Sequence, residues 1–391
     1  MSKQTGLSPF AWLVCGFVGY FFSFGVFVPY LPAWLSAHNY SVELISSVLA
    51  AAYIARFLGS VLFSQWSKPD NLILLLRLVA LGSIGLVVML ALKPDQIGLL
   101  VPLLLLLNAI FGSGIPLTDS LASTWQQQVN FNYGRARLSG SLAFMSASLS
   151  GGYILQAWGD RNMMWWLAIC LCLFLGSTLF KARLKPQAVI GASAVAANRG
   201  GSYQALLSRR HILFLVIALS LIQGAHASYY AYSVMYWTAN GIDISLTGWL
   251  WGVSVAAEVL VFFFAEKLFK NISLHSLLLF TTLVSIVRWL LTGAITDFAL
   301  LLPIQALHGI TFALCHFATV RFISGQPSGD IAKLQALYAG VACCLSVALF
   351  MWLAGFAYQH NPAWAFYLMA LLVVPALFLL PKEQPIRIRS V

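Results

Sequence analysis

Residues 116–141 read PLTDSLASTWQQQVNFNYGRARLSGS, and two opposite charges in this stretch decide how the rest of the chain is interpreted. Asp119 lies late in one long apolar run, 97–124, and Arg137 lies at the start of the next, 136–157. If both runs cross a membrane, the two charges lie on neighbouring helices near the same membrane face. An ionisable group inside a span is costly and usually meets a partner inside the bundle. We therefore expect the pair to belong to a substrate cavity.

The composition is that of a membrane protein. The chain has 391 residues, of which 60% are hydrophobic and only 8% are Asp, Glu, Lys or Arg. Ordinary soluble domains carry about 25% charged residues. Apolar runs of about 20 residues are long enough for a helix to cross the hydrocarbon core of a bilayer. We therefore predict an all-α integral membrane protein with twelve spans, in the runs 9–35, 43–65, 71–92, 97–124, 136–157, 163–182, 211–237, 245–266, 273–292, 297–323, 334–358 and 363–381.

The lysines and arginines predict the orientation. With both termini on the cytoplasmic side, only Lys93 and Arg161 fall in outer loops, and most of the 22 lysines and arginines fall in inner loops and tails. This distribution follows the positive-inside rule. It also accounts for the net charge of +11 without nucleic acid, because binding nucleic acid would need a basic face on a soluble domain. We expect a multi-pass membrane protein with both termini cytoplasmic.

A hydrophilic stretch at 184–210 divides the spans into six and six. It is basic and rich in Gly, Ala and Ser, which is typical of a flexible cytoplasmic linker. The prediction is an N-terminal six-helix bundle over 1–183, a linker over 184–210 and a C-terminal six-helix bundle over 211–391. Two six-span bundles with pseudo-two-fold symmetry, facing a site near the middle of the membrane, are the architecture of the major facilitator fold.

Several motifs strengthen this interpretation. The stretches YFFSFG (20–25), PYLPAWL (29–35) and NFNYGRAR (130–137) resemble the oligosaccharide–proton symporters of the lactose permease type. Glu258, Arg288, His308 and Arg321 follow the order and nearly the spacing of the charged positions in that group. The resemblance to bacterial phenylpropionate transporters of the same superfamily is closer and extends over nearly the whole chain. It is carried by PLTDSLASTWQ (116–126), QGAHASYY (223–230), VRWL (287–290) and LCHFA (314–318).

The resemblance implies a place in the bacterial inner membrane, alternating access, proton coupling and a substrate-contacting pair formed by Asp119 and Arg137. Two positions depart from the symporter pattern. Thr311 stands where the pattern has an acid three residues after the histidine, and Gln305 stands where it has a lysine. The proton route of the symporters therefore cannot be transferred intact.

Glu258 is then the first candidate for the proton carrier. It lies 13 residues into the run 245–266, roughly 20 Å from its outer end at 1.5 Å per residue. A carboxyl group at that depth holds a proton more readily than one in water, so it can load and release a proton as access alternates. His308, Arg288 and His316 are the other candidates for proton coupling. A permanent ion pair or a purely structural hydrogen bond is the alternative for each of them.

Further polar and aromatic residues are candidates for substrate binding or gating. Arg137 suits a carboxylate because its planar N–H donors match two oxygens, although it and Asp119 could also simply join two helices. The other candidate substrate-binding residues are Tyr20, Asn108, Gln223, His226 and Tyr230. Arg56 is a candidate for a gating ion pair, with Asp119 and Glu258 as its obvious opposites.

The hypothesis from the sequence is proton-coupled uptake of an aromatic carboxylic acid such as 3-phenylpropionate. A sugar or nucleoside–proton symporter is the alternative, and a membrane sensor that binds its ligand without moving it is a third. We expect no enzyme activity, no bound cofactor beyond the proton gradient and no metal site. The expected partners are a small-molecule substrate, protons and the lipid bilayer, without nucleic acid, and we expect a monomer.

Overall fold

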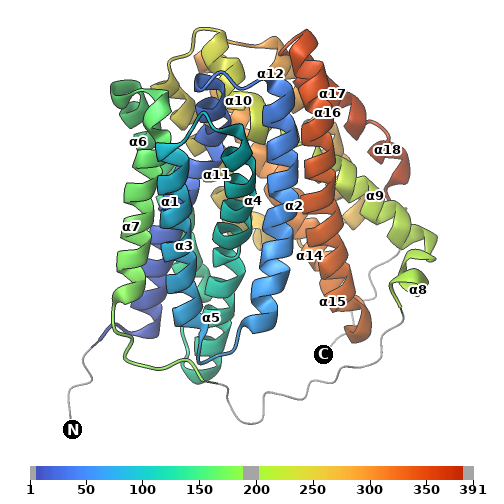
Figure 1. The fold of residues 1–391 in the computed structure, drawn as a ribbon. Coiled ribbons are helices and arrows are strands. Elements are labelled where there is room, and N and C mark those ends of the chain that lie inside the picture. The colour runs from blue at the N-terminus through green and yellow to red at the C-terminus, as the bar shows by residue number, and fades with distance from the viewer. Residues whose placement is uncertain (1–5, 188–201, 382–391) are drawn as a thin grey trace. The chain divides into compact units, whose positions relative to one another are not determined.

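The computed structural model describes residues 6–187 and 202–381, and the chain in these ranges is helical (Figure 1). The N-terminal residues 1–5, most of the predicted linker (188–201) and the C-terminal residues 382–391 lie outside the described residues. The contacts divide the chain into two compact units. The first holds 1–195, 229–253 and 296–298, and the second holds 196–228, 254–295 and 299–391.

The first unit contains the first six predicted spans. Its helices are α1 (Pro9–Ala37), α2 (Val42–Trp66), α3 (Leu72–Leu92), α4 (Ile97–Gly112), α5 (Gly114–Gln128), α6 (Tyr133–Trp158) and α7 (Met163–Leu179), with a short 3-10 turn at Asp160–Asn162. Most of α10 (Ala227–Ala239) and the start of α11 (Ile244–Phe269) also belong to this unit. Within it, α1 packs along α6 and α7, and α2 packs along α4.

The second unit contains the rest of α11 and the C-terminal helices. These are α8 (Tyr203–Leu207), α9 (Arg210–Gly224), α12 (Leu274–Ala294), α13 (Phe298–Ala306), α14 (Cys315–Ser324), α15 (Ser328–Leu337), α16 (Ser346–His360), α17 (Trp364–Val373) and α18 (Ala376–Leu379). Two π-helical segments, η2 (Gly309–Leu314) and η3 (Tyr338–Leu345), interrupt the long helices that contain α14 and α16. Such segments occur frequently at functional sites. In this unit α12 packs along α17, and α9 lies beside η3 and α16.

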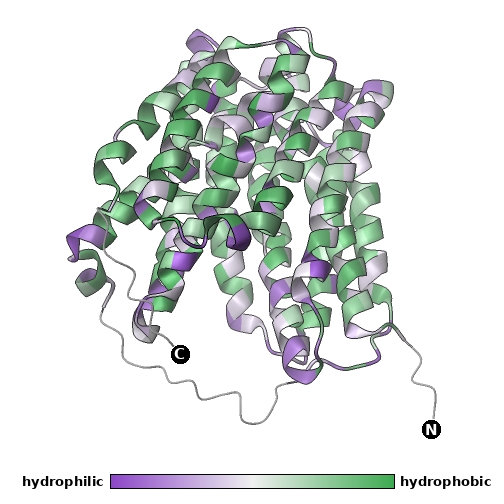
Figure 2. Cartoon of the chain, turned by 180° about the vertical axis from the view of Figure 1, so that it is seen from behind, coloured by the Kyte–Doolittle hydropathy of each residue, from purple (hydrophilic) through white to green (hydrophobic). Residues whose placement is uncertain are grey.

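Ten helical segments in the described part of the chain are long and apolar enough to cross a membrane by length and composition. They correspond to the predicted spans except the fifth and the twelfth. The fifth is α6, which has 26 residues but is less apolar because it is rich in Ser and Gly, and the twelfth is the shorter apolar segment Trp364–Leu379. Hydrophobic residues dominate the helices, and hydrophilic residues gather at the turns (Figure 2). The helical membrane fold is confirmed, while the count of twelve spans stays a prediction.

Candidate functional site

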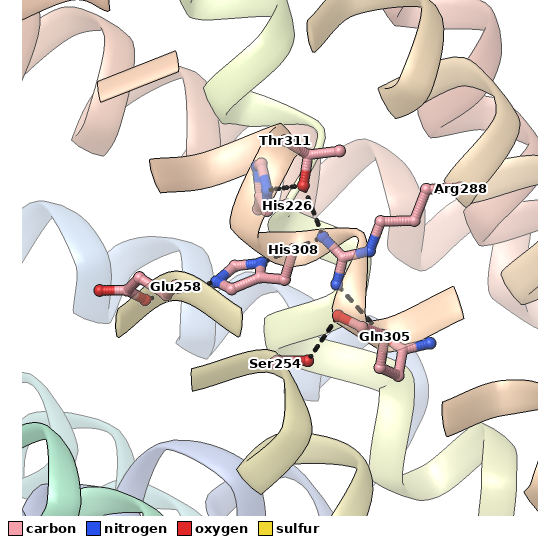
Figure 3. Close-up of polar contacts among 7 residues, drawn as sticks. All are labelled: His226, Ser254, Glu258, Arg288, Gln305, His308 and Thr311. Carbon is pink, nitrogen blue, oxygen red and sulfur yellow. Dashed lines mark hydrogen bonds and ion pairs between the residues drawn. The ribbon is translucent and has the colours of Figure 1, made fainter. Parts of the chain in front are cut away.

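Arg288 is the centre of a buried polar cluster in the second unit, which we call the Arg288 cluster: His226, Ser254, Glu258, Arg288, Gln305, His308 and Thr311 (Figure 3). The Arg288 side chain on α12 is 0% exposed. Its Nη1 donates to Thr311 Oγ1 over 2.8 Å, and its Nη2 donates to Gln305 Oε1 over 3.1 Å. The guanidinium also lies over the Trp289 ring, 4.4 Å from the ring centroid. A buried cation is tolerated when hydrogen bonds replace its water shell, and these neutral partners do so at both terminal nitrogens of Arg288.

The π-helical segment brings His308 and Thr311 to the same side as Arg288. His308 directly precedes η2 and Thr311 lies within it. At Gly309 a Cβ atom would lie 2.7 Å from the Ala257 carbonyl oxygen, so only glycine lets this backbone approach α11. Glu258 is the next residue on α11, and its Oε2 lies 3.8 Å from His308 Nε2. The close backbone approach therefore positions the carboxylate beside the histidine.

The hydrogen-bond geometry fixes the proton positions on His308. Arg288 Nη1 lies 3.0 Å from His308 Nδ1. A guanidinium has no acceptor, so Nδ1 must accept this bond and the ring carries its proton on Nε2. The Nε2–H then points toward the Glu258 carboxylate, whose side chain is 23% exposed. A second proton on His308 would break its bond to Arg288, so the ring is neutral while that bond is made.

His226 is fixed in the same way. Its Nδ1 lies 3.2 Å from the Gln223 carbonyl oxygen, which can only accept, so Nδ1 carries the proton. Its Nε2, 3.1 Å from Thr311 Oγ1, then accepts from the threonine hydroxyl. Thr311 thus accepts from Arg288 and donates to His226. The hydroxyl that replaces the acid of the symporter pattern joins the arginine to a neutral histidine.

Gln223 and His316 meet at Tyr338, a residue that the sequence analysis missed. Gln223 Nε2 donates to the Tyr338 hydroxyl over 2.9 Å, and His316 Nδ1 lies 3.1 Å from the same oxygen. Tyr338 is the first residue of η3 and is buried. A tyrosine inside an apolar run is a weak signal, because many aromatic residues in spans only fill space or anchor the helix at the interface.

Asp119 and Arg137 lie in the first unit, but a tyrosine takes the direct bond to the carboxylate. Asn132 caps α6 through a bond to the Arg135 N–H, which places Tyr133 in the first turn and Arg137 four residues later. The Tyr133 hydroxyl donates to Asp119 Oδ1 over 2.7 Å. Arg137 is close enough to Asp119 to interact with it electrostatically. Among the described residues, however, no ion pair within 4.0 Å joins the two.

Aromatic rings surround the Arg137 guanidinium. Its Cζ lies 4.1 Å from the Phe21 ring centroid and 5.7 Å from that of Phe17. Tyr20, on the same helix, is buried and donates its hydroxyl to the Phe111 carbonyl over 2.9 Å. The spacing of Tyr133 and Arg137, one helical turn apart, was the signal that could have identified Tyr133 from the sequence.

Arg56 and Asn108, two further candidate residues, are hydrogen-bonded to each other in the first unit. Arg56 Nη2 donates to Asn108 Oδ1 over 2.9 Å, in place of the carboxylate partners that the sequence suggested. The Arg56 Cζ lies 4.8 Å from the Tyr53 ring centroid, and Tyr53 in turn stacks with Tyr230 at 6.3 Å. The candidate residues of the sequence analysis thus fall into separate groups, the Arg288 cluster with the Tyr338 group in the second unit and the arginines 56 and 137 in the first.

Comparison with known proteins extends over nearly the whole chain. Residues 12–369 match a family model described as "MFS_1 like family". The chain is 37% identical over 375 residues to the "Probable 3-phenylpropionic acid transporter" of Escherichia coli (strain K12), covering 96% of this chain and 98% of that protein. It is 26% identical to the "Maltose permease" of Geobacillus stearothermophilus, over 70% of this chain and 68% of the permease.

A solved structure shares the fold. The crystal structure of nucleoside transporter NupG superposes with a TM-score of 0.74, covering 95% of this chain and 97% of that chain. Its sequence identity is 13%, so this likeness shows the fold alone.

Proposed function

We propose that this chain, which belongs to the MFS_1 like family and is a membrane transporter of the major facilitator type, takes up an aromatic carboxylic acid together with protons. 3-Phenylpropionate is the substrate that we infer. The support is the relative of that name, which is 37% identical over almost the full length of both chains.

The charges inside the first unit support an anionic substrate. Arg56 and Arg137 both lie in predicted spans of this unit, and Asp119 is the carboxylate near Arg137. Among these three residues, two guanidinium groups and one carboxylate leave a surplus of positive charge, which a substrate carboxylate would balance. We propose that Asp119, Arg137, Asn108, Tyr20 and Tyr230 contribute to the substrate site.

The contact between Glu258 and His308 is the single observation that carries the proton-coupling proposal. Arg288 holds His308 as a neutral ring whose Nε2–H faces the carboxylate, so the proton that moves is carried by Glu258. Within this cluster His226 is bonded to Thr311, and its other ring nitrogen is bonded to the Gln223 carbonyl oxygen. The Gln223 side chain and His316 both contact the Tyr338 hydroxyl. A ligand that contacts Gln223 or His226 would therefore alter the bonds that position Arg288 and His308.

Proton coupling has an energetic purpose for an anion. A membrane potential that is negative inside opposes entry by about 2.3 kcal/mol per charge per 100 mV. One proton taken up with each carboxylate cancels this penalty, and a second would make uptake electrogenic. We propose an alternating-access cycle in which Glu258 binds its proton on the outer side and releases it on the inner side. The distribution of lysines and arginines supports cytoplasmic termini. We also propose that the protein lies in the bacterial inner membrane and is a monomer.

Transport counterflow with purified protein in proteoliposomes tests the substrate. Vesicles loaded with unlabelled 3-phenylpropionate should accumulate labelled 3-phenylpropionate, whereas vesicles loaded with a galactoside, maltose or a nucleoside should not. Counterflow of a sugar or nucleoside without counterflow of the acid would favour the sugar or nucleoside–proton symporter, for which the identity to the maltose permease is the supporting observation.

A further inference from the structure

Arg56 is a cation deep in a predicted span, and no acidic partner for it lies among the described residues. It lies 14 residues after Val42, the first residue of α2, which corresponds to roughly 20 Å along the helix. Gly112 makes room for it, because a Cβ atom at that position would overlap the Arg56 Cγ. The guanidinium lies against two partly exposed rings, with its Cζ 5.2 Å from the Phe24 ring centroid and 4.8 Å from that of Tyr53.

The polar partner of Arg56 is neutral and rigidly placed. Asn108 is 1% exposed, and its Nδ2 donates to the Leu104 carbonyl over 2.9 Å. That bond fixes the amide so that its Oδ1 accepts from Arg56 Nη2 over 2.9 Å. Asn108 thus orients the guanidinium but leaves its charge unbalanced.

The Arg56 guanidinium has an N–H donor that is not used in a hydrogen bond. The Arg56 Nε is buried and has no hydrogen-bond partner among the described groups. In the same described ranges, no carboxylate lies within 4.0 Å of Arg56. An unbalanced cation with a buried, unused N–H is costly, because neither a counter-charge nor a hydrogen bond replaces the water it has lost. Arg137 differs, because Asp119 lies near enough to offset its charge.

We propose that Arg56 is the anchor for the substrate carboxylate, and that Phe24, Tyr53 and the Tyr230 ring stacked on Tyr53 contact the aromatic part of the same molecule. A carboxylate accepts two N–H bonds from the planar guanidinium, and the surrounding rings favour an aromatic group close to the charge. The ligand class is therefore an aryl-substituted monocarboxylate. This inference rests on the proposed function and assigns the carboxylate to Arg56 rather than to Arg137.

The test compares an acid with its neutral amide. Isothermal titration calorimetry on purified full-length protein would measure the affinity for 3-phenylpropionate and for 3-phenylpropionamide. The wild type should prefer the acid, and Arg56→Gln should lower the affinity for the acid by about 10- to 100-fold while the affinity for the amide changes little. Arg56→Lys keeps the charge without the planar donors, so its affinity for the acid should lie between those of the wild type and Arg56→Gln. This variant also serves as the test if Arg56→Gln does not fold.

Arg77→Gln is the matched control. Arg77 lies in a predicted span too, but its Nε and Nη2 donate to the Thr178 carbonyl oxygen over 3.1 and 3.0 Å, so its loss should leave the acid–amide preference unchanged. A preference that survives in the Arg56 variants and disappears in Arg137→Gln would overturn the assignment to Arg56 while leaving the proposed function in place. A wild type that binds neither compound would instead overturn the proposed function.

Discussion

The proposed role of Glu258 depends on which nitrogen of His308 carries the proton, and only the three-dimensional structure shows this. The sequence placed a carboxyl group deep in a predicted span and a histidine 50 residues later. The sequence could not indicate that Arg288 donates a hydrogen bond to His308 Nδ1, which leaves the ring proton on Nε2, facing Glu258. Thr311, in the position of an acid, links Arg288 to His226 through its hydroxyl. In the proposed mechanism the proton is therefore carried by Glu258 and not by this position.

Glu258→Gln should separate proton coupling from substrate movement. The amide cannot bind and release a proton, so accumulation driven by a proton gradient should be lost, while counterflow, which needs no net proton movement, should remain near the wild-type rate. Uptake and counterflow in the same proteoliposomes measure the two properties. Glu266→Gln is the control, because Glu266 lies on the same helix and is exposed. Wild-type accumulation in Glu258→Gln would remove Glu258 from the mechanism.

At the scale of elements, glycines set the close contacts between helices. Gly309 brings η2 against α11 in the second unit, and Gly248 on α11 packs against the α6 backbone in the first, where a Cβ atom would overlap the Ser148 carbonyl oxygen. The sequence offered 29 glycines with no means of ranking them. The two π-helical segments were also beyond prediction, because their register depends on packing rather than on local sequence.

Gly248→Leu should therefore destabilise the protein. A larger side chain forced into a close-packed contact typically costs about 1–3 kcal/mol. The apparent Tm of the purified protein, measured by scanning fluorimetry, should fall clearly below that of the wild type. Gly85→Leu is the matched control on α3, because a Cβ atom there would have no neighbour within 4 Å. An equal loss in the two variants would mean that the change in helix propensity, and not the contact with α6, is responsible.

At the scale of the molecule, composition and periodicity were sufficient for the fold class, and motifs such as PLTDSLASTWQ (116–126) were sufficient for the family, which the family model and the relatives confirm. The candidate site was less accessible. Asp119 and Arg137 are neighbours, as their positions on adjacent runs predicted, but Tyr133 takes the direct bond to the carboxylate. Hydrogen-bond partners such as Tyr338 and Asn108 depend on how helices rotate about their axes, which hydrophobic runs do not encode.

The most direct test of the central claim is the proton movement that accompanies the substrate. De-energised cells or proteoliposomes that contain the protein would be placed in a weakly buffered medium, and the external pH would be recorded as 3-phenylpropionate is added. We predict a transient rise in external pH that an uncoupler abolishes and that a galactoside does not produce. Uptake of labelled 3-phenylpropionate at the wild-type rate with no change in external pH would contradict the account.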